Sequence, residues 1–523
     1  MRHRMTPGLI VALSLIAAAC GSGTGTLSET TATDAGTASI GVTTAAGTES
    51  ATDPADPPVA STAGYPIVDT WQVACYDAAG AVITCPTADE AFSGQDGNYE
   101  GNQPSYRDDG DGIVSDLVTG LMWQQDPGDK MSFKQAVAGA DVFELAGYDD
   151  WRLPTIKELY SLILFTGTDP SACQSDTDVC GAIPFIDDVF DFAYGDTSDG
   201  ERFIDSQWAT STIYSGLTMG GDETMFGVNF ADGRIKGYGT SDSRTGEDKG
   251  FFVIYVRGNE AYGENEFVDG GDGTITDLAT LLMWEQDDSS SGMDWESALG
   301  YCEVSGTGGY DDWRLPNVKE LQSIVDYERS PQATGSAAID PMFGVTAIVD
   351  EDGGSDFGFY WSSTTHNSVR GGESASYVAF GEALGWMQSP QGDYTLMDVH
   401  GAGAQRSDPK TGDASDYPYG HGPQGDVIRI DNMVRCVRSG ESGTTSGALA
   451  ETAVPDLDIG AGTPAEGGHL AEAAAELGIS EDALVAALGD PAQGPPDLEE
   501  AARILGISVE ELRGVLPPPP SIP

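Results

Sequence analysis

Between residues 65 and 440, short apolar runs alternate with long polar stretches that are rich in Gly and Asp. The apolar runs carry aromatic and β-branched residues and are too short for buried helices, which favours strands. The clearest of these runs are 121–123, 207–211, 360–364 and 377–380. A helical spacing of apolar positions appears only briefly, as at Ile156, Leu159 and Ile163. The pattern therefore predicts an α+β fold with few helices.

The same pattern occurs twice. The segment 106–116 matches 267–277, and 121–126 matches 282–287. Gly147-Tyr-Asp-Asp-Trp-Arg-Leu-Pro154 recurs without change as 309–316. The spacing between the matches stays at 161 or 162 residues, which indicates two tandem homologous domains. We place copy one at 65–258 and copy two at 262–439.

Each copy carries the same helix-start signals. Ser132 and Asp294 are positioned as N-caps of a first short helix. Behind Arg-Leu-Pro, Thr155 with Glu158 forms a capping box, and Asn317 with Glu320 repeats it in copy two. We therefore expect two short helices in each copy.

The N-terminal residues have the pattern of an export signal. Arg2 and Arg4 precede an apolar stretch that ends in three alanines and Cys20, so residues 1–19 predict a signal peptide. The Cys resembles that of a bacterial lipobox, with Cys20 lipidated; the alternative is an ordinary signal peptide with an incidental Cys. The residue after this Cys is Gly21 and not Asp, as in lipoproteins that are sorted to the outer membrane. We expect a cell-envelope lipoprotein, periplasmic or surface-exposed, that contacts the membrane by its lipid anchor only.

Polar segments flank the two copies. Residues 20–64 consist almost entirely of Thr, Ala, Ser, Gly, Asp and Pro, which predicts a disordered tether. Residues 440–465 are a second linker. Within 466–523, Leu470–Ser480 matches Leu498–Ser508, which predicts a small all-α tail of two helix-turn-helix repeats with a Pro-rich end. Neither repeat has a basic face, so we favour a packing module over DNA binding.

Six cysteines follow Cys20, an even number that fits an oxidising compartment. They allow fifteen pairings, and proximity favours Cys75–Cys85 and Cys173–Cys180. Cys302 and Cys436 remain, and they align with Ala140 and Tyr255 in copy one. Joint absence from one copy is what a bonded pair predicts.

The charge of the chain excludes one class of partner. The 523 residues include 84 acidic and 24 basic ones, a net charge of −60. Such a surface repels phosphate backbones, which excludes nucleic acid as a partner.

The motifs together resemble a known family. The Asp-Gly-Asp-Gly turn, Gly-Leu-Met-Trp, the Arg-Leu-Pro motif, Trp-Ser-Ser-Thr and Val434-Arg-Cys-Val-Arg438 resemble the C-terminal domain of the Legionella collagen-like adhesin. The resemblance covers 66–258 and 262–439. It implies an exported, often duplicated surface binding domain of unknown function without known catalysis. Arg-Leu-Pro before a Glu-containing helix also resembles formylglycine-generating-enzyme-like and C-type-lectin-like folds. The adhesin is similar to proteins that bind sulfated glycosaminoglycans, but the charge of −60 opposes that ligand here.

Three groups of residues are candidate sites. The first is a possible set of calcium ligands in the Asp/Gly turns. Its residues are Asp108, Asp109, Asp111, Asp116, Asp269, Asp272 and Asp277. The alternative is that these residues only form tight hairpin turns. The second is a ligand platform at Trp151-Arg152 and Trp313-Arg314, with a buried Trp and a paired Arg as the alternative. The third is a sugar site, with an ordinary core strand as the alternative: Trp208, Trp361, Ser363 and Thr364.

No catalytic motif stands out. We find no nucleophile elbow, phosphate loop or zinc spacing, and His366, His400 and His421 lack counterparts in copy one. We therefore expect a binding protein that recognises a glycan or a protein, and not an enzyme. The alternatives are a carbohydrate-active envelope enzyme and a purely structural envelope protein.

Overall fold

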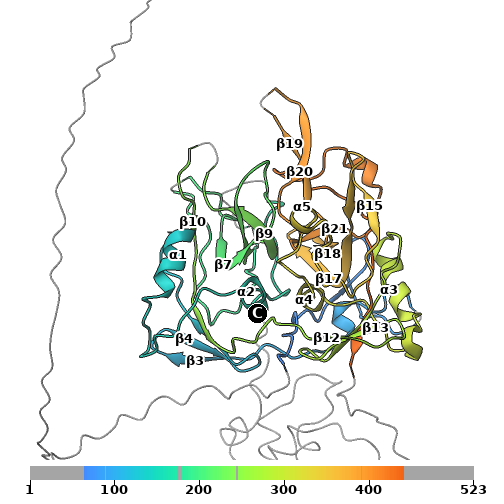
Figure 1. Ribbon diagram of the computed structural model, residues 1–523, viewed down its shortest axis with the longest axis horizontal. Helices are drawn as coiled ribbons and strands as arrows, with labels where there is room; N and C mark the ends of the chain where they lie inside the picture. The colour runs from blue at the N-terminus through green and yellow to red at the C-terminus, as the bar shows by residue number, and fades with distance from the viewer. Residues whose placement is uncertain are drawn as a thin grey trace, which may run out of the picture. The chain divides into compact units, whose positions relative to one another are not determined.

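The computed structural model describes residues 64–440 except 89, 174–179, 199, 243–244 and 390. The predicted signal peptide, Cys20, the tether, the linker beyond 440 and the helical tail lie outside the described residues. Both copies belong to one compact unit. Sheets dominate it and helices are few (Figure 1). None of the helices between 64 and 440 has the length and apolar character needed to cross a membrane.

Each copy contains one four-stranded antiparallel sheet, and the two sheets correspond strand by strand. In copy one the order is β11-β5-β4-β3, and in copy two it is β22-β14-β13-β12. The strands are β3 (Tyr106–Gly110), β4 (Ile113–Asp116), β5 (Leu121–Gln124), β11 (Val256–Gly258), β12 (Phe267–Asp269), β13 (Thr274–Asp277), β14 (Leu282–Glu285) and β22 (Val437–Ser439). The predicted duplication is therefore visible in the topology.

A six-stranded sheet is shared by the two copies, in the order β17-β18-β21-β9-β8-β7. Its strands are β7 (Gln207–Ile213), β8 (Thr224–Asn229), β9 (Arg234–Gly239), β17 (Phe359–Ser368), β18 (Gly371–Ala379) and β21 (Gln405–Pro409). The equivalent strands β9 and β21 pair antiparallel at the centre, with Ile235 opposite Gln405. Pairing of equivalent elements is the arrangement of a two-fold dimer interface, here within one chain.

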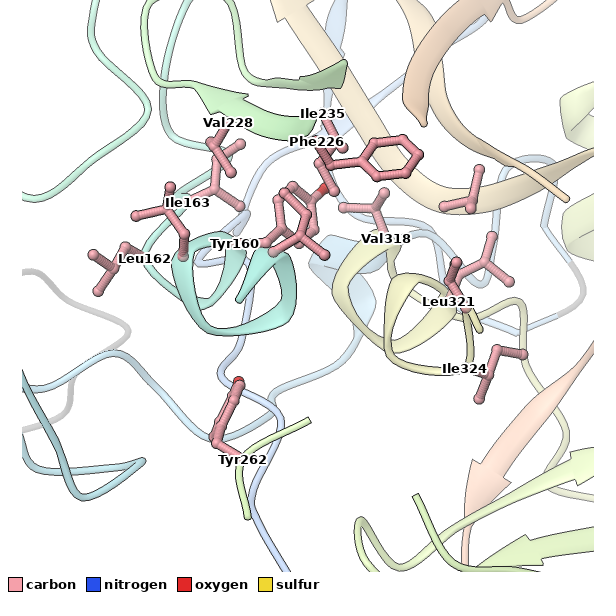
Figure 2. Close-up of a cluster of buried hydrophobic side chains, with 14 of the residues drawn as sticks. Tyr160, Leu162, Ile163, Phe226, Val228, Ile235, Tyr262, Val318, Leu321 and Ile324 are labelled. Carbon is pink, nitrogen blue, oxygen red and sulfur yellow. The ribbon is translucent and has the colours of Figure 1, made fainter. Parts of the chain in front are cut away.

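The helices are α1 (Phe133–Ala140), α2 (Ile156–Ser161), α3 (Trp295–Glu303), α4 (Val318–Ser323) and α5 (Pro331–Thr334). The predicted capping boxes are present at Thr155 and Asn317, and Ser132 and Asp294 are N-caps. The equivalent helices α2 and α4 lie side by side against the shared sheet (Figure 2). Their apolar side chains join one hydrophobic cluster that spans both copies.

Short elements complete the unit: β1 (Cys75–Tyr76), β2 (Val82–Ile83), β6 (Met131–Ser132), β10 (Gly250–Phe251), β15 (Ala347–Val349), β16 (Ser355–Phe357), β19 (Leu384–Gln388), β20 (Tyr394–Asp398) and 3-10 turns at Asp96–Asn98, Thr307–Gly309 and Ala414–Asp416. All three expected disulfides are present: Cys75–Cys85, Cys173–Cys180 and Cys302–Cys436.

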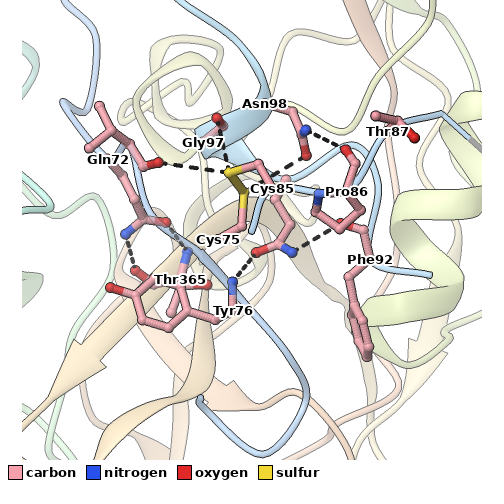
Figure 3. Close-up of a disulfide and its surroundings, with 12 residues drawn as sticks. Gln72, Cys75, Tyr76, Cys85, Pro86, Thr87, Phe92, Gly97, Asn98 and Thr365 are labelled. Carbon is pink, nitrogen blue, oxygen red and sulfur yellow. Dashed lines mark hydrogen bonds between the residues drawn. A yellow bond between two sulfur atoms is a disulfide. The ribbon is translucent and has the colours of Figure 1, made fainter. Parts of the chain in front are cut away.

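The segment before β3, which the sequence assigns to copy one, also packs against copy two. Gln72 exchanges two hydrogen bonds with the main chain of Thr365 in β17, at 2.7 and 2.8 Å (Figure 3). Asp96 accepts hydrogen bonds from Thr70 and from Thr364 of the same strand. The Cys75–Cys85 bridge closes a loop of this segment, and in that loop the Gly80 carbonyl accepts a hydrogen bond of 3.1 Å from the Gly372 amide of β18.

Buried charges also join the copies beside the central strand pair. Arg234 of β9 lies 2.7 Å from Asp169 and donates to Ser407 of β21 at 3.1 Å. Burial alone would raise the pKa of Asp169, but the Arg234 guanidinium holds it well below its usual range. The copies therefore share polar as well as apolar contacts.

Candidate functional site

The four residues predicted to line a sugar site are buried in the shared sheet. Trp208, Trp361, Ser363 and Thr364 are at most 1% exposed. In β17 eight successive residues, 359–366, are buried, so both faces of the strand are covered and its side chains cannot reach a ligand. The Nε1 of Trp361 donates to the Met293 carbonyl at 3.0 Å. The sugar-site prediction is therefore wrong, and the core-strand alternative holds.

The candidate calcium ligands act as turn formers. Asp108 and Asp269 each accept a 2.8 Å hydrogen bond from the amide two residues on, while Asp109 pairs with Arg107. Asp116 and Asp277 each accept a hydrogen bond from the backbone amide two residues further on. Asp272 accepts the Thr274 hydroxyl at 2.6 Å, and Asp111 has a φ of +54° between two glycines. Within the described part of the chain, no three His, Cys, Asp or Glu side chains converge as metal ligands would. The geometry therefore favours hairpin turns.

The Trp-Arg pairs are structural, as the alternative states. Trp151 and Trp313 are buried. Arg152 donates two hydrogen bonds to Glu158, at 2.6 and 2.5 Å, and Arg314 donates two to Glu320, both at 2.6 Å. Each pair ties the Arg-Leu-Pro segment to the capping box of the following helix.

The acidic residues before each Trp have partners that sequence reasoning missed. Asp150 accepts two hydrogen bonds from Arg257, and Asp312 accepts two from Arg438. The same guanidinium groups lie 3.8 and 3.9 Å from the ring centres of Tyr148 and Tyr310. The repeated Gly-Tyr-Asp-Asp-Trp-Arg motif thus anchors the last strand of each copy.

A surface cleft of about 380 Å³ lies in copy two. We call it the aromatic cleft. Its lining residues come from the β15–β16 hairpin, from β19 and from the loops before β22: Ile348, Val349, Glu351, Trp386, Ala414, Tyr417, Pro418, Val427, Ile428, Arg429 and Asp431. Its volume falls in the range of small-molecule sites, and its lining combines apolar side chains with charged groups.

Exposed tyrosines extend the aromatic cleft outward. Tyr394 and Tyr419 stack with ring centres 3.9 Å apart, although they are 38% and 51% exposed. Trp386 meets Tyr419 edge-on at 6.1 Å. Aromatic side chains ordered at the surface without burial are typical of recognition sites, because they present an apolar face and a polar tip.

The charged side chains of the aromatic cleft are held in place. Arg429 donates to both carboxylate oxygens of Glu351, at 2.9 and 3.2 Å. Its guanidinium lies 3.9 Å from the ring centre of Phe359. A bidentate pair stacked on a ring has little freedom, so the cleft presents a fixed polar edge to a ligand.

The β19–β20 hairpin beside the aromatic cleft has no counterpart among the described residues of copy one. There β8 and β9 are joined by a turn of only four residues, 230–233, whereas β18 and β21 are separated by residues 380–404. This insertion carries the β19–β20 hairpin, which projects from the unit (Figure 1). Trp386 and Tyr394 lie in this insertion, and Tyr419 lies between β21 and β22, where copy two is also longer than copy one. Aromatic residues in these two longer segments were the sequence signal for the site.

Asp398 fixes the base of this hairpin to copy one. Its Oδ2 accepts a hydrogen bond from Tyr214 at 2.7 Å, and its Oδ1 accepts one from the Gly401 amide at 2.7 Å. Burial raises the pKa of Asp398 to about 7 in spite of these bonds, and the nearby charge of Glu382 acts in the same direction.

We expect Asp398 to make the free energy of unfolding depend on pH. Its pKa is about 4 in the unfolded chain and about 7 in the folded one. The stabilisation is therefore complete below about pH 4 and is lost as the pH rises to about 7, with a slope of at most about 1.4 kcal/mol per pH unit. Urea unfolding of Asp398→Asn should show a flatter dependence than the wild type between about pH 5 and about pH 6.5. An unchanged slope would contradict this assignment.

Comparison with known proteins identifies the repeated domain. The family described as the Lcl C-terminal domain matches the chain twice, over residues 112–257 and 273–397. No curated protein and no solved structure matches the chain, so the resemblance to C-type-lectin-like folds stays a prediction. The two family matches together cover just over half of the 523 residues. The chain therefore belongs to the Lcl C-terminal domain family and carries the domain in two tandem copies.

Proposed function

We propose that this protein is an adhesin-like binding protein of the bacterial cell envelope, anchored through a lipid on Cys20, and that copy two recognises a glycan at the aromatic cleft. The stacked, exposed pair Tyr394 and Tyr419 beside Trp386 carries the proposal. Sugar rings present C–H faces that pack on aromatic rings, while their hydroxyls bond to charged groups such as those of Glu351 and Arg429. The family, associated with a Legionella collagen-like adhesin, is compatible with a surface role.

The charge of the chain limits the glycan. At a net charge of −60, sulfated polymers and nucleic acids are repelled at long range, so a neutral or amino-bearing glycan fits best. Binding without catalysis is part of the proposal, because the carboxylate of Glu351 is held by Arg429. Calcium is not required in it, since the Asp/Gly turns already use their carboxylates in hydrogen bonds.

The test is a glycan array probed with the full chain, in calcium and again with a chelator. We expect the same sugars to bind in both buffers. Trp386→Ala and Tyr419→Ala should each weaken binding by about tenfold, since one lost aromatic contact costs about 1.5 kcal/mol. Trp71→Ala is the matched control, because Trp71 is 40% exposed and does not line the cleft.

Each outcome separates the alternatives. Loss of binding on chelation would restore calcium to the mechanism. Silence on the array in both buffers would contradict the glycan and leave a protein partner or a structural role. Equal effects of Trp386→Ala and Trp71→Ala would move the site away from the aromatic cleft.

A further inference from the structure

The junction between the two copies contains a lysine and an asparagine in direct contact. Lys157, on α2 of copy one, donates a hydrogen bond of 2.7 Å to Oδ1 of Asn265, just before β12 of copy two. It also donates to the Gly263 carbonyl at 2.9 Å. The amine is therefore held against the side-chain amide by two contacts, and the two residues are 108 positions apart in the chain.

A buried carboxylate lies on the other side of the same amide. Asn265 donates through Nδ2 to Oδ2 of Asp277 at 2.7 Å. Asp277 is fully buried, and its other oxygen accepts the amides of Glu266 and Ala279 at 2.9 and 3.0 Å. The acid is thus fixed in position beside the nitrogen that would leave if the amide were attacked.

Two tyrosines cover this group. Tyr65 and Tyr262 are buried, with ring centres 4.6 Å apart, and the hydroxyl of Tyr65 lies 3.4 Å from Nδ2 of Asn265. Both tyrosines line a small cavity of about 10 Å³ that Lys157 also lines, enough space for about one water. Aromatic cover strengthens electrostatic effects on the reacting groups and limits competing hydrolysis.

We propose that Lys157 and Asn265 form an intramolecular isopeptide bond that covalently links the two copies, with Asp277 as the catalytic residue. The neutral amine of Lys157 attacks Cγ of Asn265. A bond forms between Nζ and Cγ, and the bond between Cγ and Nδ2 breaks. The surplus proton on Nζ passes by way of the Asp277 carboxylate to Nδ2, which leaves as ammonia. The step exchanges one amide for another and requires no oxidant, cofactor or second enzyme.

The state of the lysine supports this chemistry. Burial lowers the pKa of Lys157 to about 8, although the charges of Asp277 and Glu264 oppose the shift. About a tenth of the amine is therefore neutral near pH 7, far more than at the usual pKa of a lysine, and the neutral form is the nucleophile.

The duplication supplies an internal control. Lys319 is the equivalent lysine on α4, and its hydrogen bonds among the described residues go to the main-chain carbonyls of Asp69 and Ser161. The position equivalent to Asn265 is Pro104 in copy one, which has no amide side chain. Lys157 therefore contacts a side-chain amide, whereas the hydrogen bonds of Lys319 go to main-chain carbonyls.

The test is digestion of the reduced, denatured full chain with a protease that cleaves after unmodified lysine, followed by tandem mass spectrometry. We expect no cleavage after Lys157 and normal cleavage after Lys319. Residues 135–236 and 250–319 should appear as one branched species whose mass is that of the two peptides less one ammonia. Fragment ions should place the branch at Lys157 and Asn265.

Variants confirm the assignment. Asn265→Ala should restore cleavage after Lys157, and Lys157→Arg should release an unbranched 250–319. Asn265→Asp should form the same bond to Lys157 with loss of water instead of ammonia. The branched product then has the same mass as in the wild type. Free 135–157 and unmodified 250–319 in the digest of wild-type chain that was folded before it was reduced and denatured would overturn the proposal, whether or not any variant folds.

Discussion

Replacing both Cys302 and Cys436 by alanine is expected to lower the free energy of unfolding by about 3–5 kcal/mol. The bond joins α3 to the residue that precedes β22, across a sequence separation of 134. Closing so long a loop removes more conformational freedom from the unfolded chain than a short loop does. Both sulfurs are fully buried in the core of copy two, so the alanines also leave a small cavity.

Denaturant unfolding of the Cys302→Ala/Cys436→Ala variant measures this loss. The matched control is Cys75→Ala/Cys85→Ala, whose bridge spans only 10 residues and should contribute about 2–3 kcal/mol. A larger loss in the control than in the test variant would contradict the loop-length argument. It would indicate instead that the contacts of the N-terminal segment with copy two contribute more to stability than the long loop does.

Those parts of the fold that depend on local chemistry could be predicted from the sequence. Thr155 and Asn317 cap their helices because a capping box needs only four residues. The Cys302–Cys436 pair followed from the comparison of one copy with the other. In each case the information lies within a few residues or in the repeat itself.

The contacts between the copies could not be predicted in this way. Nothing near Ile235 or Gln405 indicates that these residues pair with each other, since an edge strand has the same pattern whether or not another strand covers it. The polar run Ser362–Thr365 predicted a sugar site, but it is buried in the core. Ser362 donates to the Ser376 carbonyl at 2.8 Å, and Thr364 donates to Asp96. Gln72 reaches Thr365 across 293 residues.

The aromatic cleft was missed for a different reason. A search guided by the repeat favours residues that both copies share, and those residues, such as Trp151 and Trp313, build the common core. Trp386 and Tyr419 lie in segments that copy one lacks. In a duplicated protein, the shared motifs define the scaffold, and the unmatched insertions are where a site specific to one copy is found.

The second large effect is expected from Glu320→Ala, which should lower the free energy of unfolding by about 3–5 kcal/mol. Glu320 is 7% exposed and accepts two hydrogen bonds from Arg314 and one of 2.9 Å from the Asn317 amide. Alanine leaves the Arg314 guanidinium, whose side chain is only 15% exposed, without its carboxylate partner, and it removes half of the capping box. Glu320→Gln keeps an acceptor for the Asn317 amide but not the charge, so it should lose less.

A double-mutant cycle of Glu320→Ala with Arg314→Ala measures the coupling, and Lys134→Ala is the control. Lys134 pairs with Asp248 at the surface, with its side chain 77% exposed, and should contribute less than about 1 kcal/mol. Glu158→Ala makes the equivalent change in copy one. Because α2 and α4 share one hydrophobic cluster, both variants should shift a single cooperative transition. Two separate transitions would show that the copies unfold independently, and that the shared sheet does not couple them.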